Sequence, residues 1–236
     1  LYYICILFYS TMKRMYAVIC ADVVESTSLD IDSLINMRQV FNDTFADIRG
    51  HLRVDFWARL IKGDYIECCC DSSALALRIA MILKCRLKWW AEAFNCGGER
   101  LKTLGLRFSI GVGQMRIIDP QRDIMDGEAI YVAGRGLNRL SHTEATSCFS
   151  FVSSDASVEG LMDNNVNFID EYINSMSARQ CAVIYYKLLG FLEKDIAEIL
   201  HLSQPAVNMR AKLASWPLIN KALSVIDKVE YGKYVF

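Results

Sequence analysis

Two aspartates follow apolar, strand-like segments of the chain and are placed where a pair of metal ligands is needed. Asp22 closes the apolar run 16–21, and Asp64 lies in a Gly-Asp turn between the strand-like segments 56–62 and 65–70. Neighbouring strands would bring the two carboxylates to one edge of a sheet. The spacing therefore predicts a palm-like nucleotide site. The alternative is that Asp22 only caps the next helix and Asp64 only favours a tight turn.

The elements that must position these residues alternate between strand and helix. The expected order is a strand at 16–21, a helix at 29–52 preceded by capping serines and a threonine, a hairpin of 56–62 and 65–70, a helix at 73–94, a strand at 106–113, a polar loop at 119–126, a helix at 128–140 and a strand at 148–152. This order predicts an α+β fold of ferredoxin-like plan, with an antiparallel sheet covered by helices on one face.

Four short motifs in this region resemble those of a known family. They are Ala21-Asp-Val-Val-Glu-Ser-Thr27, Ile61-Lys-Gly-Asp64, Arg107-Phe-Ser-Ile-Gly-Val-Gly113 and Asp126-Gly-Glu-Ala-Ile-Tyr-Val-Ala-Gly-Arg135. They occur in the order of the motifs of class III nucleotide cyclases, and they are more similar still to the bacterial SatD family, which shares the cyclase-like fold. The resemblance covers about residues 16–152.

The resemblance implies roles for three residues. Asp22 and Asp64 match the two metal-binding aspartates, so Mg²⁺ or Mn²⁺ is the implied cofactor. Arg135 matches the arginine that stabilises the charge of the transition state. Cyclase-type sites are shared between two chains, so the resemblance also implies a homodimer.

Other positions around the implied site are mixed. Ser26 and Thr27, at the expected start of a helix, offer N–H groups to a phosphate. Glu25 would repel the negatively charged ligand, and Lys62 is the cation expected to offset this repulsion. Tyr131 stands where the family has an asparagine that orients the ribose.

Two positions bear on base recognition. Leu60 replaces the lysine that selects adenine, and Glu128 replaces an acid of similar type. These departures favour a nucleotide-sensing or dimerising role over catalysis.

The segment after Ser177 predicts a helix-turn-helix. Ile196, Ala197 and Leu200 form an apolar face on a short helix, and His201 is a residue that tolerates the left-handed conformation of a tight turn. The next helix, 204–214, would be the reader of DNA, with Val207, Ala211 and Ala214 buried. Its expected DNA-binding residues are Ser203, Gln204, Asn208, Arg210 and Lys212.

This second region, over about residues 177–215, resembles region four of sigma factors and related response-regulator readers. The alternative is a three-helix packing module that makes no contact with DNA. The charge distribution is compatible with DNA, because residues 177–236 carry eight Lys or Arg and five acids although the whole chain has a net charge of −1.

The 236 residues suffice for two domains, and the 53% of apolar residues argues against disorder. The expected division is an N-terminal extension without function at 1–14, with the true start at Met12 or Met15, a cyclase-like domain at 15–152, a polar linker at 153–176 and the helix-turn-helix domain at 177–236. The apolar segment 1–9 is too short to span a bilayer.

Nine cysteines without a Cys-x-x-Cys pair favour reduced thiols and a cytoplasmic protein. Trp89 and Trp90, beside Lys84, Arg86 and Lys88, are interpreted as core with a solvated edge; stacking on a nucleic acid is the alternative.

Two hypotheses follow. The favoured one is a DNA-binding transcriptional regulator with a cyclase-like sensing or dimerising domain, whose partners are duplex DNA, a nucleotide ligand and a second copy of the chain, with no membrane. The other is an active metal-dependent nucleotide cyclase or nucleotidyl transferase with a tethered DNA-binding module. A purely structural adaptor is a third, weaker possibility.

Overall fold

Largely apolar segments build the central strands of the sheet. The computed structural model describes residues 15–151 and 156–228. Strand β1 (Met15–Val23) pairs antiparallel with β3 (Tyr65–Cys70) on one side and β4 (Leu106–Asp119) on the other, and β2 (Phe56–Ile61) pairs with β3. The strand order β2-β3-β1-β4 is that of the ferredoxin-like plan. The hairpin predicted between β2 and β3 is therefore present.

Two further strands lie beside β4. Strand β5 (Ile124–Gly127) pairs antiparallel with the end of β4, and β6 (Ser147–Phe151) pairs parallel with its first half. The segment expected as a polar loop at 119–126 therefore contains most of a strand. Residue 152, the last of the expected final strand, and residues 1–14 lie outside the described residues.

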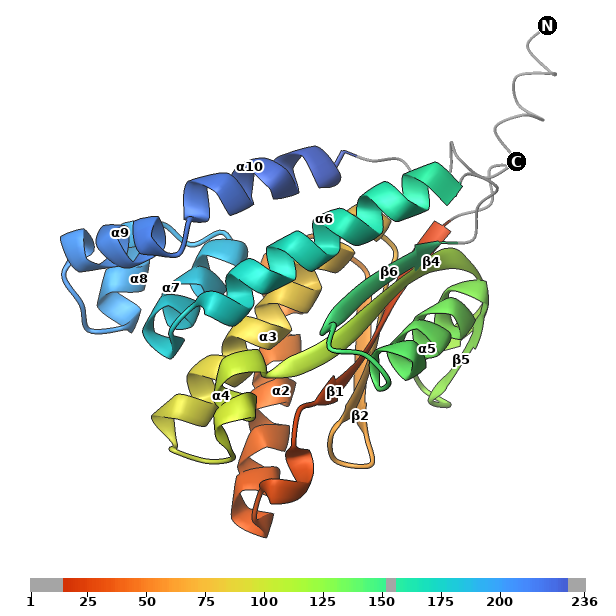
Figure 1. Cartoon of the computed structure of the whole chain (residues 1–236), viewed down its shortest axis with the longest axis horizontal. Helices are drawn as coiled ribbons and strands as arrows, with labels where there is room; N and C mark the ends of the chain where they lie inside the picture. Colours follow the sequence, from red (N-terminus) through yellow and green to blue (C-terminus); the bar gives the residue numbers. More distant parts are fainter. Residues whose placement is uncertain (1–14, 152–155, 229–236) are drawn as a thin grey trace, which may run out of the picture.

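Helices cover both faces of the sheet, which corrects the expectation of one covered face. Ala17, Ile19 and Ala21 of β1 belong to a core shared with α2 (Ile31–His51) and α3 (Ala76–Ala93), whereas Val18 and Cys20 belong to a second core under α5 (Glu128–Leu140). Successive side chains of a strand point to opposite faces, so one strand serves both cores. Figure 1 shows α5 on the opposite side of the sheet from α2 and α3.

Glycines let α5 lie close to β4. A Cβ atom on Gly111 would lie 2.3 Å from the carbonyl oxygen of Ala129 and 2.6 Å from the amide nitrogen of Ala133. A Cβ atom on Gly136 would lie 2.1 Å from the hydroxyl of Ser109. Small residues on both elements therefore allow contact between the helix and the strand backbone.

The segment predicted as a linker at 153–176 is instead largely a helix of the main body. Helix α6 (Ala156–Ser175) packs against β6 and α3, and Met162, Val166, Ile169 and Ile173 are buried in the principal core. Their spacing of four, three and four residues is that of one helix face. The prediction of a linker was wrong because the many polar residues on the outer face of α6 obscured this apolar face in the sequence.

Two lysines of α3 fix the position of α6. The Lys84 ammonium, with no exposed surface, lies 2.5 Å from Oδ1 of Asp170, and the Lys88 ammonium donates hydrogen bonds of 2.5 and 2.9 Å to the carbonyl oxygens of Ile173 and Asn174. Lys88 therefore satisfies carbonyl groups at the end of α6, which lack partners within the helix. Both lysines were expected at a solvated edge, and both are buried.

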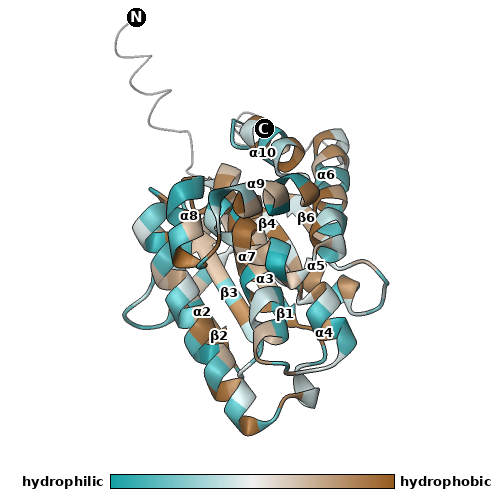
Figure 2. Ribbon diagram, turned by 90° about the vertical axis from the view of Figure 1, so that its left-hand side faces the viewer, coloured by the Kyte–Doolittle hydropathy of each residue, from teal (hydrophilic) through white to brown (hydrophobic). Residues whose placement is uncertain are grey.

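Five further helices are described. They are α4 (Glu99–Leu104), α7 (Ala178–Leu188), α8 (Glu193–Ile199), α9 (Gln204–Leu213) and α10 (Trp216–Ile226), with short 3-10 turns η1 (Ser26–Ser28) and η2 (Ser73–Leu75) elsewhere. Among them, α7, α8 and α9 form one end of the molecule (Figure 1). Figure 2, which views the molecule from this end, shows α8 and α9 in front of the sheet.

Helix α7 joins this end to the body through two of its faces. Cys181, Ile184 and Leu188 are buried in the principal core against α3, whereas Val183 is buried in a separate cluster with α8 and α9. The hydroxyl of Tyr185 also donates a hydrogen bond to Asp47 of α2. Because α7 contributes to both cores, the C-terminal helices are packed onto the body instead of being tethered by a linker.

Candidate functional site

The two predicted metal ligands lie at the same end of the sheet. Asp22 pairs in register with Tyr65 of β3 and Arg107 of β4. The amide of the next residue, Val23, donates a hydrogen bond of 3.1 Å to the carbonyl oxygen of Asp64. The fold thus brings the end of β1 against the turn of the hairpin, as the sequence predicts.

One of these carboxylates is bound by an arginine that sequence reasoning did not single out. The guanidinium of Arg107 donates hydrogen bonds of 3.1 and 2.5 Å to the two oxygens of Asp22. The pair is partly exposed, with 30% of the Arg107 side chain and 25% of the Asp22 side chain accessible. A bidentate contact of this kind fixes the position of the carboxylate and stabilises its negative charge. The sequence offered one indication of this contact, because Arg107 is the first residue of the motif at 107–113.

The other carboxylate also has a partner within the protein. The hydroxyl of Ser26 donates a hydrogen bond of 2.6 Å to Oδ2 of Asp64. No group of three or more His, Cys, Asp or Glu side chains suited to a metal ion exists among the described residues. Mg²⁺ is usually held by one or two carboxylates together with water and substrate phosphates. Asp22 and Asp64 would therefore hold Mg²⁺ or Mn²⁺ only after the contact of Arg107 with both oxygens of Asp22 had opened.

The expected phosphate site at a helix N-terminus differs from the structure. Ser26 and Thr27 form the short 3-10 turn η1, which follows Glu25 in the left-handed conformation (φ 55°). Helix α2 begins only at Ile31, where Asp30 accepts a hydrogen bond of 2.8 Å from the amide of Ser33. The Asp30 side chain therefore caps α2 at the amide of Ser33, and Ser26 and Thr27 do not open that helix.

The predicted cation at the hairpin lies in solvent. Lys62 is exposed, and it adopts positive φ (52°) beside Gly63 (94°) at the turn of the β2-β3 hairpin. Glu25, the acid it was expected to offset, lies 3.9 Å from Arg100 of α4.

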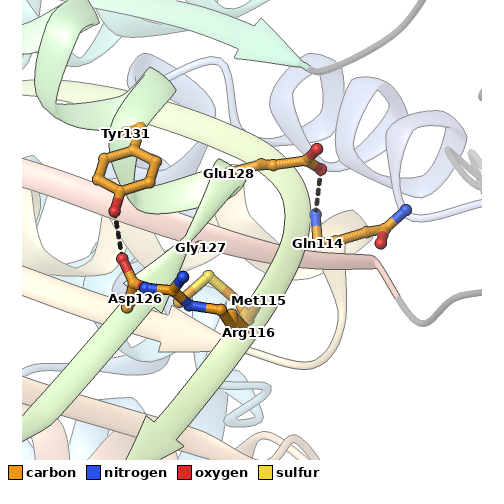
Figure 3. Close-up of a pocket in the computed structure, with 7 residues that line it drawn as sticks. All are labelled: Gln114, Met115, Arg116, Asp126, Gly127, Glu128 and Tyr131. Carbon is orange, nitrogen blue, oxygen red and sulfur yellow. Dashed lines mark hydrogen bonds and ion pairs between the residues drawn. The ribbon is translucent and has the colours of Figure 1, made fainter.

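The other predicted nucleotide-binding residues line a hollow at the opposite end of the sheet. This hollow, of about 390 Å³, is formed by the end of β4, by β5 and by the start of α5 (Figure 3). Glu128 accepts a hydrogen bond of 3.2 Å from the amide of Gln114, and the hydroxyl of Tyr131 donates to Asp126. Arg116 forms an ion pair with the same Asp126.

These contacts perturb the titration of Asp126 and Tyr131. The hydrogen bond from Tyr131, with the charge of Arg116, lowers the pKa of Asp126 below its ordinary value. The same hydrogen bond raises the pKa of Tyr131, because loss of the phenol proton would break the bond and place a second negative charge beside Asp126. The hollow therefore presents a neutral phenol beside a charged carboxylate near neutral pH.

Within one chain the two halves of the predicted site are far apart. Asp22 pairs with Arg107 near the start of β4, whereas Met15 at the other end of β1 pairs with Gln114. Seven residues of strand correspond to roughly 23 Å. Arg135 lies on α5 one turn beyond Tyr131, and both side chains are exposed. Glu128 and Tyr131 thus lie apart from the aspartates, whereas Arg135 lies outside the hollow, next to Gly136, which packs on Ser109 of β4.

Helices α8 and α9 are joined by a tight turn. His201 adopts φ 52°, and the amide of Leu202 donates a hydrogen bond of 2.8 Å to the carbonyl oxygen of Ala197. Ser203 caps α9 by accepting a hydrogen bond from the amide of Ala206, and a proline occupies the first turn of α9. Val207 and Ala211 are buried against α8 and α7.

The predicted reader residues point in two directions. Gln204 and Lys212 are exposed. Asn208, between them on the same side of α9, is half-buried and donates its amide hydrogens to the Glu193 carboxylate at 3.3 and 3.4 Å. Arg210 differs, because at 100° per residue it lies about 150° away from the middle of the exposed face. It lines a hollow against α3 and α7.

Glu193 ties the three C-terminal helices together. Besides accepting from Asn208 of α9, it lies 3.0 Å from the ammonium of Lys187 on α7. The hydrogen bond from Lys187 lowers the pKa of Glu193 below its ordinary value of 4.5. The carboxylate is therefore charged near neutral pH and fixes α8 between its neighbours.

Comparisons with known proteins give little beyond these observations. No protein-family model matches the chain, and no curated protein matches it. One similar solved structure is that of a bacterial light-regulated adenylyl cyclase, with 15% identity, a TM-score of 0.39, and coverage of 57% of this chain and 74% of that chain. A TM-score this low does not by itself establish a shared fold. Among the helices of residues 15–151 and 156–228, none has the length and apolar character needed to cross a membrane.

Proposed function

We propose that this protein is a DNA-binding transcriptional regulator whose sheet domain senses a nucleotide or forms a homodimer. The observation that carries the proposal is the outer face of α9, where Gln204 and Lys212 are exposed on a capped helix at the edge of the molecule. An α-helix fits the major groove of B-DNA, where Gln pairs with adenine and Lys holds phosphate.

The attachment of α9 supports this role. The cluster of Val183, Ile196, Val207 and Ala211 holds α9 on α7, and α7 is itself buried against α3. A reader helix on such a support keeps a fixed orientation relative to the rest of the chain. Two copies related by a two-fold axis would then present two reader helices at a fixed separation, as half-sites about one helical turn apart require.

The distribution of residues over the sheet supports a homodimer. The aspartates lie at one end of β1, whereas Glu128 and Tyr131 line a hollow at the other. Two chains packed head to tail would bring the aspartates of one chain to the α5 residues of its partner. The resemblance to nucleotide cyclases, whose sites are shared between chains, motivates this arrangement.

The bidentate contact between Arg107 and Asp22 favours sensing over catalysis. A guanidinium in this position neutralises a carboxylate that a cyclase would use for its metal ions. The guanidinium of Arg107 instead suits a nucleotide phosphate, which would compete with Asp22 for it. If the protein were an active cyclase or nucleotidyl transferase, incubation with each nucleoside triphosphate and Mg²⁺ or Mn²⁺ would release pyrophosphate; we expect none.

An electrophoretic shift with duplex genomic fragments, with and without nucleoside triphosphates, tests the function. We expect the unaltered protein to retard DNA, and Gln204→Ala and Lys212→Ala to weaken retardation by about tenfold or more. Lys102→Ala, on the surface of α4, is the matched control and should bind DNA as the unaltered protein does. Absence of any retardation, or equal loss in the control, would count against DNA reading by α9.

A further inference from the structure

The hollow that contains Arg210 lies where the C-terminal helices meet the body. Its volume is about 510 Å³, and its walls come from the end of α3, the start of α7, the end of α8 and the middle of α9. This volume falls within the usual range for small-molecule sites in proteins. The hollow is separate from the aspartates and from the hollow at the start of α5.

Two guanidinium groups line this hollow without a counter-ion. Neither Arg179 of α7 nor Arg210 of α9 makes a hydrogen bond or an ion pair with another of the described residues. Other arginines of the body, such as Arg59 and Arg78, are each bound to a carboxylate. Arginine pairs bind carboxylate and phosphate groups through parallel N–H donors.

The rest of the wall is mostly apolar. Trp89 and Ala93 of α3 face Ile199 and Leu200 of α8, and Ile199 is 42% exposed. The indole of Trp89 already has Arg86 stacked on it, with the guanidinium carbon 4.5 Å from the ring centroid. Its position is therefore fixed before any ligand binds, which lowers the entropic cost of binding.

One carboxylate is also present. Glu92 of α3 is exposed at the hollow, and its carboxylate makes no hydrogen bond or ion pair within the described part of the chain. With Arg179 and Arg210 it gives the hollow a net charge of +1. A ligand whose anionic group binds the two arginines can direct a hydroxyl or amino group to Glu92.

We propose that this hollow binds a small organic anion, a molecule with one carboxylate or phosphate group and a flat apolar part. The anionic group lies between Arg179 and Arg210, and the apolar part lies against Trp89 and Ile199. Such a ligand contacts α3 of the body and all three helices α7, α8 and α9, so its binding stabilises their junction. The inference does not depend on whether α9 reads DNA.

Phenyl phosphate is the probe, and its neutral analogue benzyl alcohol is the control ligand. Titration of the full chain, followed by tryptophan fluorescence and by ligand-detected NMR, should show saturable binding of phenyl phosphate and at least about tenfold weaker binding of benzyl alcohol. Saturating phenyl phosphate should also raise the melting temperature, because a ligand of the folded state stabilises it. Equal binding of both compounds, or of neither, overturns the proposal.

Variants locate the site. Arg179→Gln and Arg210→Gln should each weaken phenyl phosphate binding by about tenfold, the usual effect of losing one charge-assisted hydrogen bond. Arg38→Gln, an exposed arginine on α2, is the matched control and should bind as the unaltered protein does. Arg179 is exposed, so its replacement leaves folding intact even if the Arg210 variant is destabilised. Unchanged affinity in Arg179→Gln overturns the assignment.

Discussion

Replacement of Asp170 by asparagine tests whether α6 is part of the body. The side chains of Lys84 and Asp170 are 0% and 2% exposed, and their charged atoms lie 2.5 Å apart. At an effective dielectric constant of about 20, unit charges at this separation attract by roughly 7 kcal/mol, which offsets the cost of removing both from water. Asp170→Asn keeps the shape but leaves the lysine charge unpaired, and its single side-chain oxygen accepts from Lys84 or from Thr146 but not from both.

The expected loss is about 3–5 kcal/mol in the free energy of unfolding, the usual cost of breaking a buried ion pair. The double variant Lys84→Met with Asp170→Asn removes both charges, and we expect it to lie within about 2 kcal/mol of the unaltered protein. Urea-induced unfolding, followed by circular dichroism and tryptophan fluorescence, measures all three proteins.

The pH dependence of Asp170→Asn adds a second readout. Burial lowers the pKa of Lys84 below its ordinary value of 10.5, so the unfolded chain binds this proton more tightly than the folded one. Stability of the variant should therefore rise as the pH increases toward 10.5, where the unfolded chain also loses the proton. A single variant that loses less than about 1 kcal/mol would refute the packing of α6 against α3.

Two other predictions concern α5 and α8. Gly111→Ala should cost about 2 kcal/mol or more, because its Cβ would lie 2.3 Å from the backbone oxygen of Ala129, whereas Gly134→Ala on α5, with no atom within 4 Å, should stabilise by about 1 kcal/mol; thermal unfolding compares the two, and equal effects would contradict the close packing of α5 on β4. Glu193→Gln should cost about 1 kcal/mol near neutral pH, and the difference should disappear as the pH falls below about 4.5, because the lowered pKa of Glu193 stabilises the folded chain only while the carboxylate is charged; a difference that persists in acid, measured by urea unfolding at each pH, would contradict the role of the Lys187 contact.

Strand periodicity made the core of the fold predictable. The alternation of Leu106, Phe108, Ile110 and Val112 placed β4, and the Gly-Asp turn placed the β2-β3 hairpin. These signals are local, so they survive without knowledge of the partners. The sequence could not show which residues of β1 face which core, because a strand buried on both faces is apolar throughout.

The contacts that fix α6 and α9 depend on distant residues. A buried lysine such as Lys84 is rare without a partner, and its partner Asp170 is 86 residues away in the sequence. The direction of Arg210 likewise depends on where α9 packs, and the helix pattern alone assigned it to the outer face with Lys212. Arg107 was visible in its motif, but its pairing with Asp22 required the register of β1 and β4.

The salt dependence of duplex DNA binding tests the central claim most directly. Fluorescence anisotropy with a labelled duplex fragment, at a series of salt concentrations, gives the slope of log affinity against log salt for the unaltered protein and for Lys212→Ala. We predict affinity that falls steeply with salt, and a slope smaller by about one in the variant, because one phosphate contact is lost. Affinity that does not change with salt, or an identical slope in the variant, would contradict DNA binding through the exposed face of α9.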